Sequence, residues 1–268
     1  MKKLEHLSEI YNFYDAFIVD LWGVIHNGIK LNSGAMEVVK NLTKNNKRIT
    51  FLSNAPRPNA SVVKFLRKLN MKEEYLKNVL TSGEAAVKSL NDNKFGVKFF
   101  HLGPKKDISL FMRLEKNKTT LEKSDFILCT GLFDEYENDL NYYKKLLKDY
   151  ISKKLICTNP DLMVHRGGKK EHCAGAVADI FKFLGGEVVY FGKPYKEVYD
   201  LCLNKNEKTF VIGDNLNTDI KGANNLNLDS LFITGGIHRS EYKNENDLEI
   251  LLKQYKVTTQ YFQQNLSW

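Results

Sequence analysis

Residues 16–28 read AFIVDLWGVIHNG, an apolar run that ends at a carboxylate and continues into a glycine-bearing turn. The run from Ala16 to Val19 is typical of a short buried strand. A carboxylate at the end of such a strand is costly to bury unless another group pairs with it. The stretch therefore predicts a partner for Asp20, and it raises the question of why the residue two places later is the bulky, uncharged Trp22.

Short apolar runs of this kind alternate with longer helical patterns, which is typical of a parallel sheet flanked by helices. Strands are predicted at 15–20, 48–53, 97–102, 125–130, 154–158, 187–191, 208–213 and 229–234. Helices are predicted at 34–46, 59–70, 84–92, 139–150, 173–184 and 195–205. The sequence thus predicts an α/β protein whose core is a Rossmann-like, doubly wound parallel sheet.

The totals of the 268-residue chain agree with this class. Hydrophobic residues make up 43% and charged residues 27%, an ordinary balance for a soluble globular protein. No run of about 18 apolar residues is present, so no membrane span is expected. The N-terminal stretch MKKLEHLSEIYNFYDAF carries charges throughout and lacks an apolar signal segment, which predicts a cytoplasmic location.

Neither the cysteines nor the net charge points to a special class. The cysteines are widely spaced, without a CxxC motif or a Cys/His cluster, so we expect buried reduced thiols at Cys129, Cys157, Cys173 and Cys202. The net charge of +8 comes from scattered lysines whose densest groups are pairs. We therefore expect no nucleic-acid partner.

Three of the predicted strands end in polar residues followed by turn signals, in VDLWG, FLSNAPRP and VIGDN. In an open parallel sheet, ligands bind beyond the carboxyl ends of the strands. If these three strands are neighbours, Asp20, Ser53 and Asp214 converge on one pocket.

The segment at about 85–187 contains strands and helices of its own. A segment of this length is too long to be a loop. We therefore predict a core domain of residues 1–84 and 188–268, with a second domain of residues 85–187 inserted in it.

The residues at the strand ends suit the chemistry of a phosphate group. Asp20 and Asp214 can hold a hard cation such as Mg²⁺, which prefers oxygen ligands. The hydroxyl and amides at Ser53 and Asn54 can hold the oxygens of an anion, and Lys193 in YFGKP can supply a fixed positive charge. Metal, lysine and hydroxyl together make a phosphate cradle, with one unprotonated aspartate available as a nucleophile.

The stretch VIGDNLNTDIKGANN carries a second carboxylate, Asp219, five residues after Asp214. Thr218 is predicted to cap a helix that begins near it. One carboxylate would face the pocket, and the other would orient the metal shell or pair with Lys193. GDNLNTD alone also suits a plain strand-to-helix turn, but its combination with Ser53 and Lys193 favours a functional interpretation.

Together these motifs resemble the haloacid dehalogenase-like (HAD) hydrolase superfamily. They resemble in particular its subfamily IIA, the NagD-like and phosphoglycolate/pyridoxal-phosphate phosphatase branch. GDNLNTDI is the most specific match, followed by FGKPYKEVY and LSNAPRP. CTNPDLMV at 157–164 and HCAGAVADI at 172–180 resemble parts of the α/β cap, of the C2 type, that this branch inserts in its core. The resemblance covers nearly the whole chain and implies that the 85–187 domain is such a cap.

The resemblance implies a two-step phosphoryl transfer from a small phosphorylated metabolite, in which Asp20 forms an aspartyl-phosphate that water hydrolyses. Mg²⁺ would be held by Asp20, by the backbone carbonyl of Trp22 and by Asp214. The catalytic residues that the motifs imply are Asp20, Ser53, Lys193 and Asp219, and the phosphate-binding residues are Ser53, Asn54 and Lys193. These roles agree with a transition state whose charge is spread over three phosphoryl oxygens.

The sequence departs from the superfamily at Trp22. Hydrolases of the superfamily usually read Asp-x-Asp, and the second aspartate protonates the leaving oxygen and later activates water. The backbone carbonyl of Trp22 can still bind a metal, but its indole can neither donate a proton to an alkoxide nor act as a base. General acid–base help contributes about 10²–10⁴-fold, so esters with poor leaving groups should suffer most. His26 is the nearest substitute, although a packing or surface role is favoured for a lone histidine.

Three interpretations of the sequence stay open. The first is a phosphatase whose substrate needs little acid help, or in which another group substitutes. The second is carbon-centred substitution, as in dehalogenases, although the GDNLNTD motif argues against chemistry that needs no metal. The third is a phosphate-binding relative without meaningful catalysis.

The inserted domain offers Asp161, His165, Arg166 and His172 for contact with a leaving group, and it leaves room for a homodimer through the caps.

Overall fold

The computed structural model describes residues 1–166 and 169–268 and divides the chain into two compact units. The first unit comprises Met1–Ser53, Val63–Leu80 and Tyr199–Trp268, and the second comprises Asn54–Val62 and Thr81–Val198. The segment 85–187 lies within the second unit, and its limits as a domain stay a prediction.

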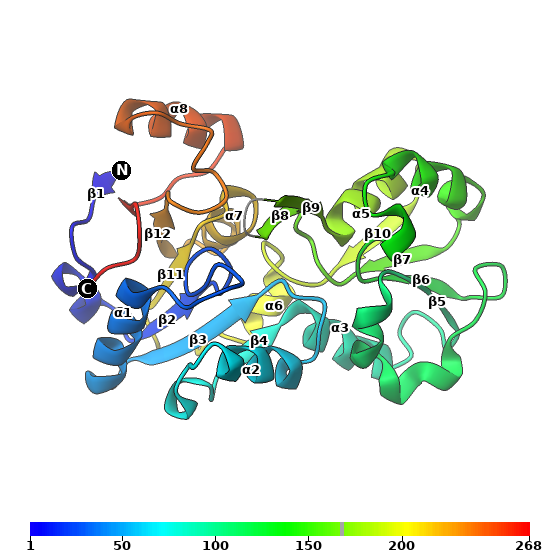
Figure 1. Ribbon diagram of the computed structural model, residues 1–268, viewed down its shortest axis with the longest axis horizontal. Coiled ribbons are helices and arrows are strands. Elements are labelled where there is room, and N and C mark those ends of the chain that lie inside the picture. Colours follow the sequence, from blue (N-terminus) through cyan, green and yellow to red (C-terminus); the bar gives the residue numbers. More distant parts are fainter. Residues whose placement is uncertain (167–168) are drawn as a thin grey trace. The chain divides into compact units, whose positions relative to one another are not determined.

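The first unit is built on a seven-stranded sheet with the strand order β1-β13-β12-β11-β2-β3-β4 (Figure 1). Its strands are β1 (Lys2–Lys3), β2 (Ala16–Val19), β3 (Arg48–Ser53), β4 (Val79–Thr81), β11 (Thr209–Gly213), β12 (Asp229–Ile233) and β13 (Tyr261–Gln263). Neighbours pair in parallel from β1 through β13, β12, β11 and β2 to β3. The predicted parallel α/β core is therefore confirmed.

The central strands of this sheet are continuous apolar runs because both of their faces are covered. Every residue of β2 and of β11 is buried. Helix α1 (Ser33–Lys44) buries Ala35, Val38, Val39 and Leu42, whose spacing of three and four residues puts them on one helical face. The other helices with residues in the unit are α2 (Asn59–Lys68), α6 (Lys196–Asp200), η8 (Leu216–Ile220), α7 (Lys221–Asn225) and α8 (Glu245–Tyr255).

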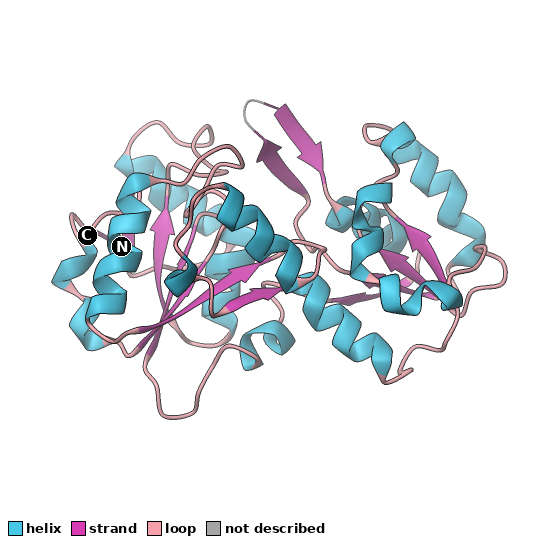
Figure 2. Ribbon diagram, turned by 60° about the horizontal axis from the view of Figure 1, so that its bottom comes forward, coloured by secondary structure: helices cyan, strands magenta, loops and turns pink. Residues whose placement is uncertain are grey.

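The second unit has its own four-stranded parallel sheet, ordered β10-β7-β6-β5. Figure 2 shows helices beside the strands in each unit. The elements here are α3 (Ser82–Asn91), β5 (Phe99–Leu102), β6 (Phe126–Cys129), α4 (Leu140–Leu147), β7 (Lys154–Cys157), α5 (Ala174–Phe183) and β10 (Glu187–Tyr190). An antiparallel hairpin joins β8 (Met163–Arg166) to β9 (Lys169–His172). The glycines between these two strands, and the side chains at positions 165 and 166, lie outside the described part of the chain.

Each of the eight predicted strands is present, to within two residues at either end. The four cysteines are buried and free, as predicted. Short 3₁₀ turns complete the chain at Leu7–Glu9, Tyr11–Phe13, Glu73–Tyr75, Lys105–Leu110, Met112–Asn117, Asp134–Tyr136 and Lys148–Tyr150. None of the helices within the described ranges has the length and apolar character that a membrane crossing requires.

Candidate active site

The three polar strand ends that the sequence singled out belong to adjacent strands. Strand β2 lies between β11 and β3, with Val19 in register with Ile212 and with Phe51. Asp20 follows β2, Ser53 ends β3 and Asp214 follows β11. Because the strands are parallel, these residues lie at the same edge of the sheet. The condition that the three strands are neighbours is therefore met.

Three carboxylates gather at this edge. Asp20, Asp214 and Asp219 each offer an oxygen, and these oxygens all lie within 4.8 Å of one another. The three residues are buried, with exposed fractions of 7%, 5% and 2%. The Asp219 carboxylate accepts a hydrogen bond from the Asn215 amide at 3.2 Å, and the Asp219 carbonyl accepts one from the Tyr199 hydroxyl at 3.4 Å. The two acidic residues of GDNLNTDI therefore face one site together with Asp20.

Glycines make room for this cluster. A Cβ atom on Gly23, which has φ of +88°, would stand 2.1 Å from Asp214 Oδ2, and one on Gly236 would stand 2.0 Å from the same oxygen. A Cβ on Gly213 would stand 2.1 Å from the Cβ of Asp219. A Cβ at any of the three positions would overlap an aspartate side chain, so glycine leaves room there for Asp214 and Asp219.

The turn that carries Asp219 is capped by a different residue from the one predicted. The Asn215 side chain accepts a hydrogen bond from the Asn217 amide, and η8 begins at Leu216. The prediction that Thr218 caps this helix is wrong, because Thr218 already lies inside the turn and is buried. Asn215 is the better cap because it directly precedes the first turn.

The cluster suits a divalent cation. Like charges this close raise the free energy of a buried site unless a cation or protons compensate them. The three side chains provide only carboxylate oxygens, which are the ligands of Mg²⁺, Ca²⁺ and Mn²⁺ rather than of soft metals. Among residues 1–166 and 169–268 this is the one group of three such side chains with metal-binding spacing.

Trp22 and His26 pack against each other in the loop after Asp20. Their rings meet edge to face at 5.2 Å between centroids, and the His26 ring also meets Phe65 at 5.4 Å. A Cβ on Gly28 would stand 2.7 Å from Cη2 of Trp22, so the indole lies over this glycine. The His26 Nδ1 accepts a hydrogen bond from the Gly28 amide at 3.1 Å.

Burial lowers the pKa of His26 to about 4. The imidazole is therefore neutral near pH 7, and because Nδ1 accepts a hydrogen bond its proton is on Nε2. These contacts give His26 the packing role that the sequence favoured, and they account for the Trp22 side chain as its partner.

Lys193 and Asn54 are joined within the second unit. The Asn54 side chain accepts a hydrogen bond from the Lys193 amide at 2.8 Å and donates one to the Lys193 carbonyl at 3.1 Å. It also donates to Asp161 at 3.2 Å. A Cβ on Gly192 would stand 2.6 Å from Asn54 Oδ1, which explains the glycine of the FGKP motif. Lys193 is 2% exposed, and Asn54 fixes its backbone.

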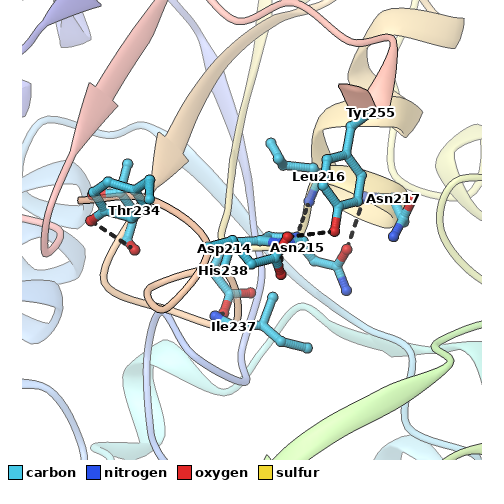
Figure 3. A network of polar contacts seen from close by, with 10 residues as sticks. Asp214, Asn215, Leu216, Asn217, Thr234, Ile237, His238 and Tyr255 are labelled. Carbon is cyan, nitrogen blue, oxygen red and sulfur yellow. Dashed lines mark hydrogen bonds and ion pairs between the residues drawn. The ribbon is translucent and has the colours of Figure 1, made fainter. Parts of the chain in front are cut away.

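A loop that the sequence did not single out also contacts Asp214 of the acidic cluster (Figure 3). The Ile237 amide donates a hydrogen bond to Asp214 Oδ2 at 2.8 Å, and His238 Nε2 accepts one from the Leu216 amide at 3.1 Å. The signal was present in SLFITGGIH, where an apolar strand is followed by two glycines. That strand, β12, is the neighbour of β11, so its end lies at the same edge of the sheet.

Comparison with known families agrees with this geometry. Residues 17–115 match the model of a haloacid dehalogenase-like hydrolase family, and residues 190–253 match a HAD-hydrolase-like model. The two matched segments contain Asp20, Ser53, Lys193, Asp214 and Asp219.

Individual proteins of this family are similar to the chain. Ribonucleotide monophosphatase NagD of Escherichia coli is 34% identical over 88 residues, a match that spans 31% of this chain and only 34% of NagD. A 4-nitrophenylphosphatase of Schizosaccharomyces pombe is 28% identical over an alignment that covers 99% of this chain and 97% of the yeast protein. The crystal structure of a haloacid dehalogenase-like hydrolase from Brucella suis superposes with a TM-score of 0.86 at 29% identity, covering 98% and 99% of the two chains.

The chain has a parallel α/β core with acidic residues at the ends of neighbouring strands, which is the arrangement of a HAD-type hydrolase, and both family models match it. It therefore belongs to the haloacid dehalogenase-like hydrolase superfamily. Within it the chain is a NagD-like member, of subfamily IIA. The family predicted from the motifs is confirmed.

Proposed function

We propose that this protein is a Mg²⁺-dependent phosphatase that acts on a small phosphorylated metabolite, with Asp20 as the nucleophile. The observation that carries the proposal is the cluster of three buried carboxylates whose oxygens lie within 4.8 Å of one another. The names of the relatives, a ribonucleotide monophosphatase and a 4-nitrophenylphosphatase, support a phosphate ester as the substrate.

The proposed reaction has two steps. A carboxylate oxygen of Asp20 attacks phosphorus while the bond from phosphorus to the leaving oxygen breaks, and the leaving oxygen takes a proton from solvent. Water then attacks the phosphorus of the aspartyl-phosphate, the acyl oxygen departs, and Asp20, a proton and inorganic phosphate are released. Asp20, Asp214 and the carbonyl of Trp22 would hold Mg²⁺, which when bound neutralises negative charge on the phosphoryl oxygens.

The other residues of the motifs neutralise and orient the phosphoryl group in this scheme. The Ser53 hydroxyl donates a hydrogen bond to a phosphoryl oxygen, and the Lys193 ammonium supplies a positive charge. Asn54 keeps the Lys193 backbone in place through its two hydrogen bonds. Asp219, on the first turn after Asp214, orients the ligands of the metal.

The tryptophan at position 22 limits which phosphate esters the protein can hydrolyse. With indole at the position of the usual acid, the leaving oxygen departs without a proton from this residue. His26 is neutral and packed against Trp22 and Phe65, so it is a poor substitute. We therefore propose substrates whose leaving group is itself acidic, such as aryl or acyl phosphates.

Hydrolysis of p-nitrophenyl phosphate by the purified protein tests the proposal. We expect release of p-nitrophenol with Mg²⁺, loss of the activity with EDTA, and recovery when Mg²⁺ is added in excess. Asp20→Asn should abolish turnover, whereas Asp149→Asn, which changes an exposed aspartate, should not. Phosphate binding without turnover of aryl or acyl phosphates, or metal-independent halide release from a 2-haloacid, would refute the proposal.

A further inference from the structure

The loop after β12 contacts the acidic turn, residues 214–219, at two points. Ile237 holds Asp214 through an amide-to-carboxylate hydrogen bond of 2.8 Å, and His238 holds the Leu216 amide at 3.1 Å. Ile237 and His238, which are consecutive in the loop, therefore contact two residues of the acidic turn that are two positions apart. Figure 3 shows Ile237 and His238 beside Asp214, Asn215 and Leu216.

The Leu216 amide is the first of the turn that carries Asp219. The first amides of a helical turn have no acceptor within the turn and need one from outside. His238 supplies this acceptor from a buried position, with 4% of its surface exposed. The imidazole thus holds the start of the turn between Asp214 and Asp219.

The proton of His238 is on the other ring nitrogen. Since Nε2 accepts a hydrogen bond, the neutral ring carries its proton on Nδ1. That nitrogen lies 2.8 Å from Glu241 Oε1, and Glu241 Oε2 accepts a hydrogen bond from the Tyr255 hydroxyl at 2.8 Å. Burial and Glu241 raise the pKa of Tyr255 to about 12, so this hydroxyl keeps its proton.

Tyr255 also packs edge to face on the imidazole, with 4.8 Å between ring centroids. It belongs to α8, whose Leu248, Leu251 and Leu252 share one apolar cluster with Leu216. The helix that carries the hydroxyl is therefore anchored on the same turn that the imidazole holds.

We propose that His238 is a positioning residue that sets the spacing of Asp214 and Asp219 for metal binding, with Glu241 and Tyr255 fixing its tautomer. This proposal rests on the metal site of the proposed function. Loss of the imidazole acceptor lets the first turn of η8 rotate. The rotation separates the carboxylates of Asp214 and Asp219 and lowers the affinity of the site for the cation.

Binding of Mn²⁺ to the full chain without substrate, measured by electron paramagnetic resonance, tests the proposal. His238→Leu removes the acceptor, and we expect the dissociation constant to rise about tenfold, the equivalent of one hydrogen bond. His238→Gln offers a side-chain oxygen near the position of Nε2 and should recover most of the affinity. A role in packing alone would give the opposite order, because leucine suits an apolar site better than glutamine.

A pair of tyrosines supplies the matched control. Tyr255→Phe removes the hydroxyl that contacts Glu241 and should weaken Mn²⁺ binding about threefold. Tyr242→Phe removes a hydroxyl that donates to the Thr234 carbonyl at 3.2 Å, next to the same apolar cluster, and should leave the binding unchanged. Long-range ¹H–¹⁵N spectra should show the proton of His238 on Nδ1 in the wild type.

The outcomes separate the two proposals. If the wild type binds Mn²⁺, Asp214→Asn abolishes binding and every variant at positions 238 and 255 binds as the wild type does, the positioning role is overturned while the metal site stands. A proton on Nε2 of His238 also overturns it. If the wild type itself does not bind Mn²⁺, the proposed metal site fails, and the role of His238 fails with it.

Discussion

Replacing Trp22 by aspartate should extend the phosphatase activity to alkyl phosphates. The substitution restores a carboxylic acid at the position where the superfamily usually has one, in the loop directly after Asp20. General acid catalysis contributes about 10²–10⁴-fold, so kcat/KM for an alkyl phosphate should rise by a factor in that range. For p-nitrophenyl phosphate, whose leaving group needs little help, the rise should be less than tenfold.

The same substitution has a cost in stability that the structure allows us to size. The indole loses its contact with His26, which for an aromatic pair is worth about 0.5–1.5 kcal/mol beyond the buried area. It also uncovers Gly28. Truncation of a fully buried Trp costs about 3–5 kcal/mol, and because Trp22 is only partly buried we expect about 2 kcal/mol. Assays should therefore run well below the unfolding temperature of the variant.

Trp22→Asn is the matched control, because it removes the same contacts and has the size of aspartate without its acidity. The measurement is kcat/KM of the wild type and both variants on an alkyl and an aryl phosphate with Mg²⁺. We expect kcat/KM on the alkyl ester to rise for the aspartate variant alone. Equal behaviour of the aspartate and asparagine variants, or an equal gain on both esters, would refute a role for the acid.

Two further predictions concern stability and the backbone of Lys193. The pKa of His26 is about 4 in the folded protein and about 6.5 in an unfolded chain. The folded state therefore binds fewer protons between these values, and the free energy of unfolding falls as the pH drops from 6.5 to 4. At pH 4.5 the His26 contribution to this loss is about 2.5 kcal/mol. The free energy of unfolding, measured with urea at pH 7.5 and 4.5, should therefore differ less for His26→Asn than for the wild type. An equal difference in the two proteins would contradict this prediction. Asn54→Ala removes two hydrogen bonds to Lys193, each worth about 1 kcal/mol, so kcat/KM on p-nitrophenyl phosphate should fall about 10–100-fold. Asn78→Ala, which removes an exposed hydrogen bond to Ile49, should leave it unchanged.

Much of the fold was predictable because eight of its strands contain apolar runs. Such runs are expected when both faces of a parallel sheet are covered, and each of them became a strand. Strand β4 has three residues, too few for a pattern. The hairpin of β8 and β9 was also missed, since it is rich in charged residues and lacks alternation. Helix α8 could have been predicted from Asn244 and Asp247, which form a capping box ahead of an apolar stripe.

The candidate site was predictable where it depends on strand ends. Asp20, Ser53 and Asp214 follow apolar runs, and parallel strands bring such ends to one edge. The grip of His238 on Leu216 was not predictable, because it depends on one ring nitrogen meeting one amide 22 residues away in the chain. The link from Asn54 to Lys193, across 139 residues, is of the same kind.

In the proposed site, Asp20 and Asp214 share one divalent cation. A crystal of the wild type grown with Mn²⁺ and an unhydrolysed phosphate analogue measures this directly through the anomalous signal of the metal. We predict one strong peak bound by a carboxylate oxygen of each residue, at about 2.1 Å as for Mg²⁺, with the analogue bound to the same ion. A peak at another place, or an analogue bound in the site with no ion between Asp20 and Asp214, would contradict it.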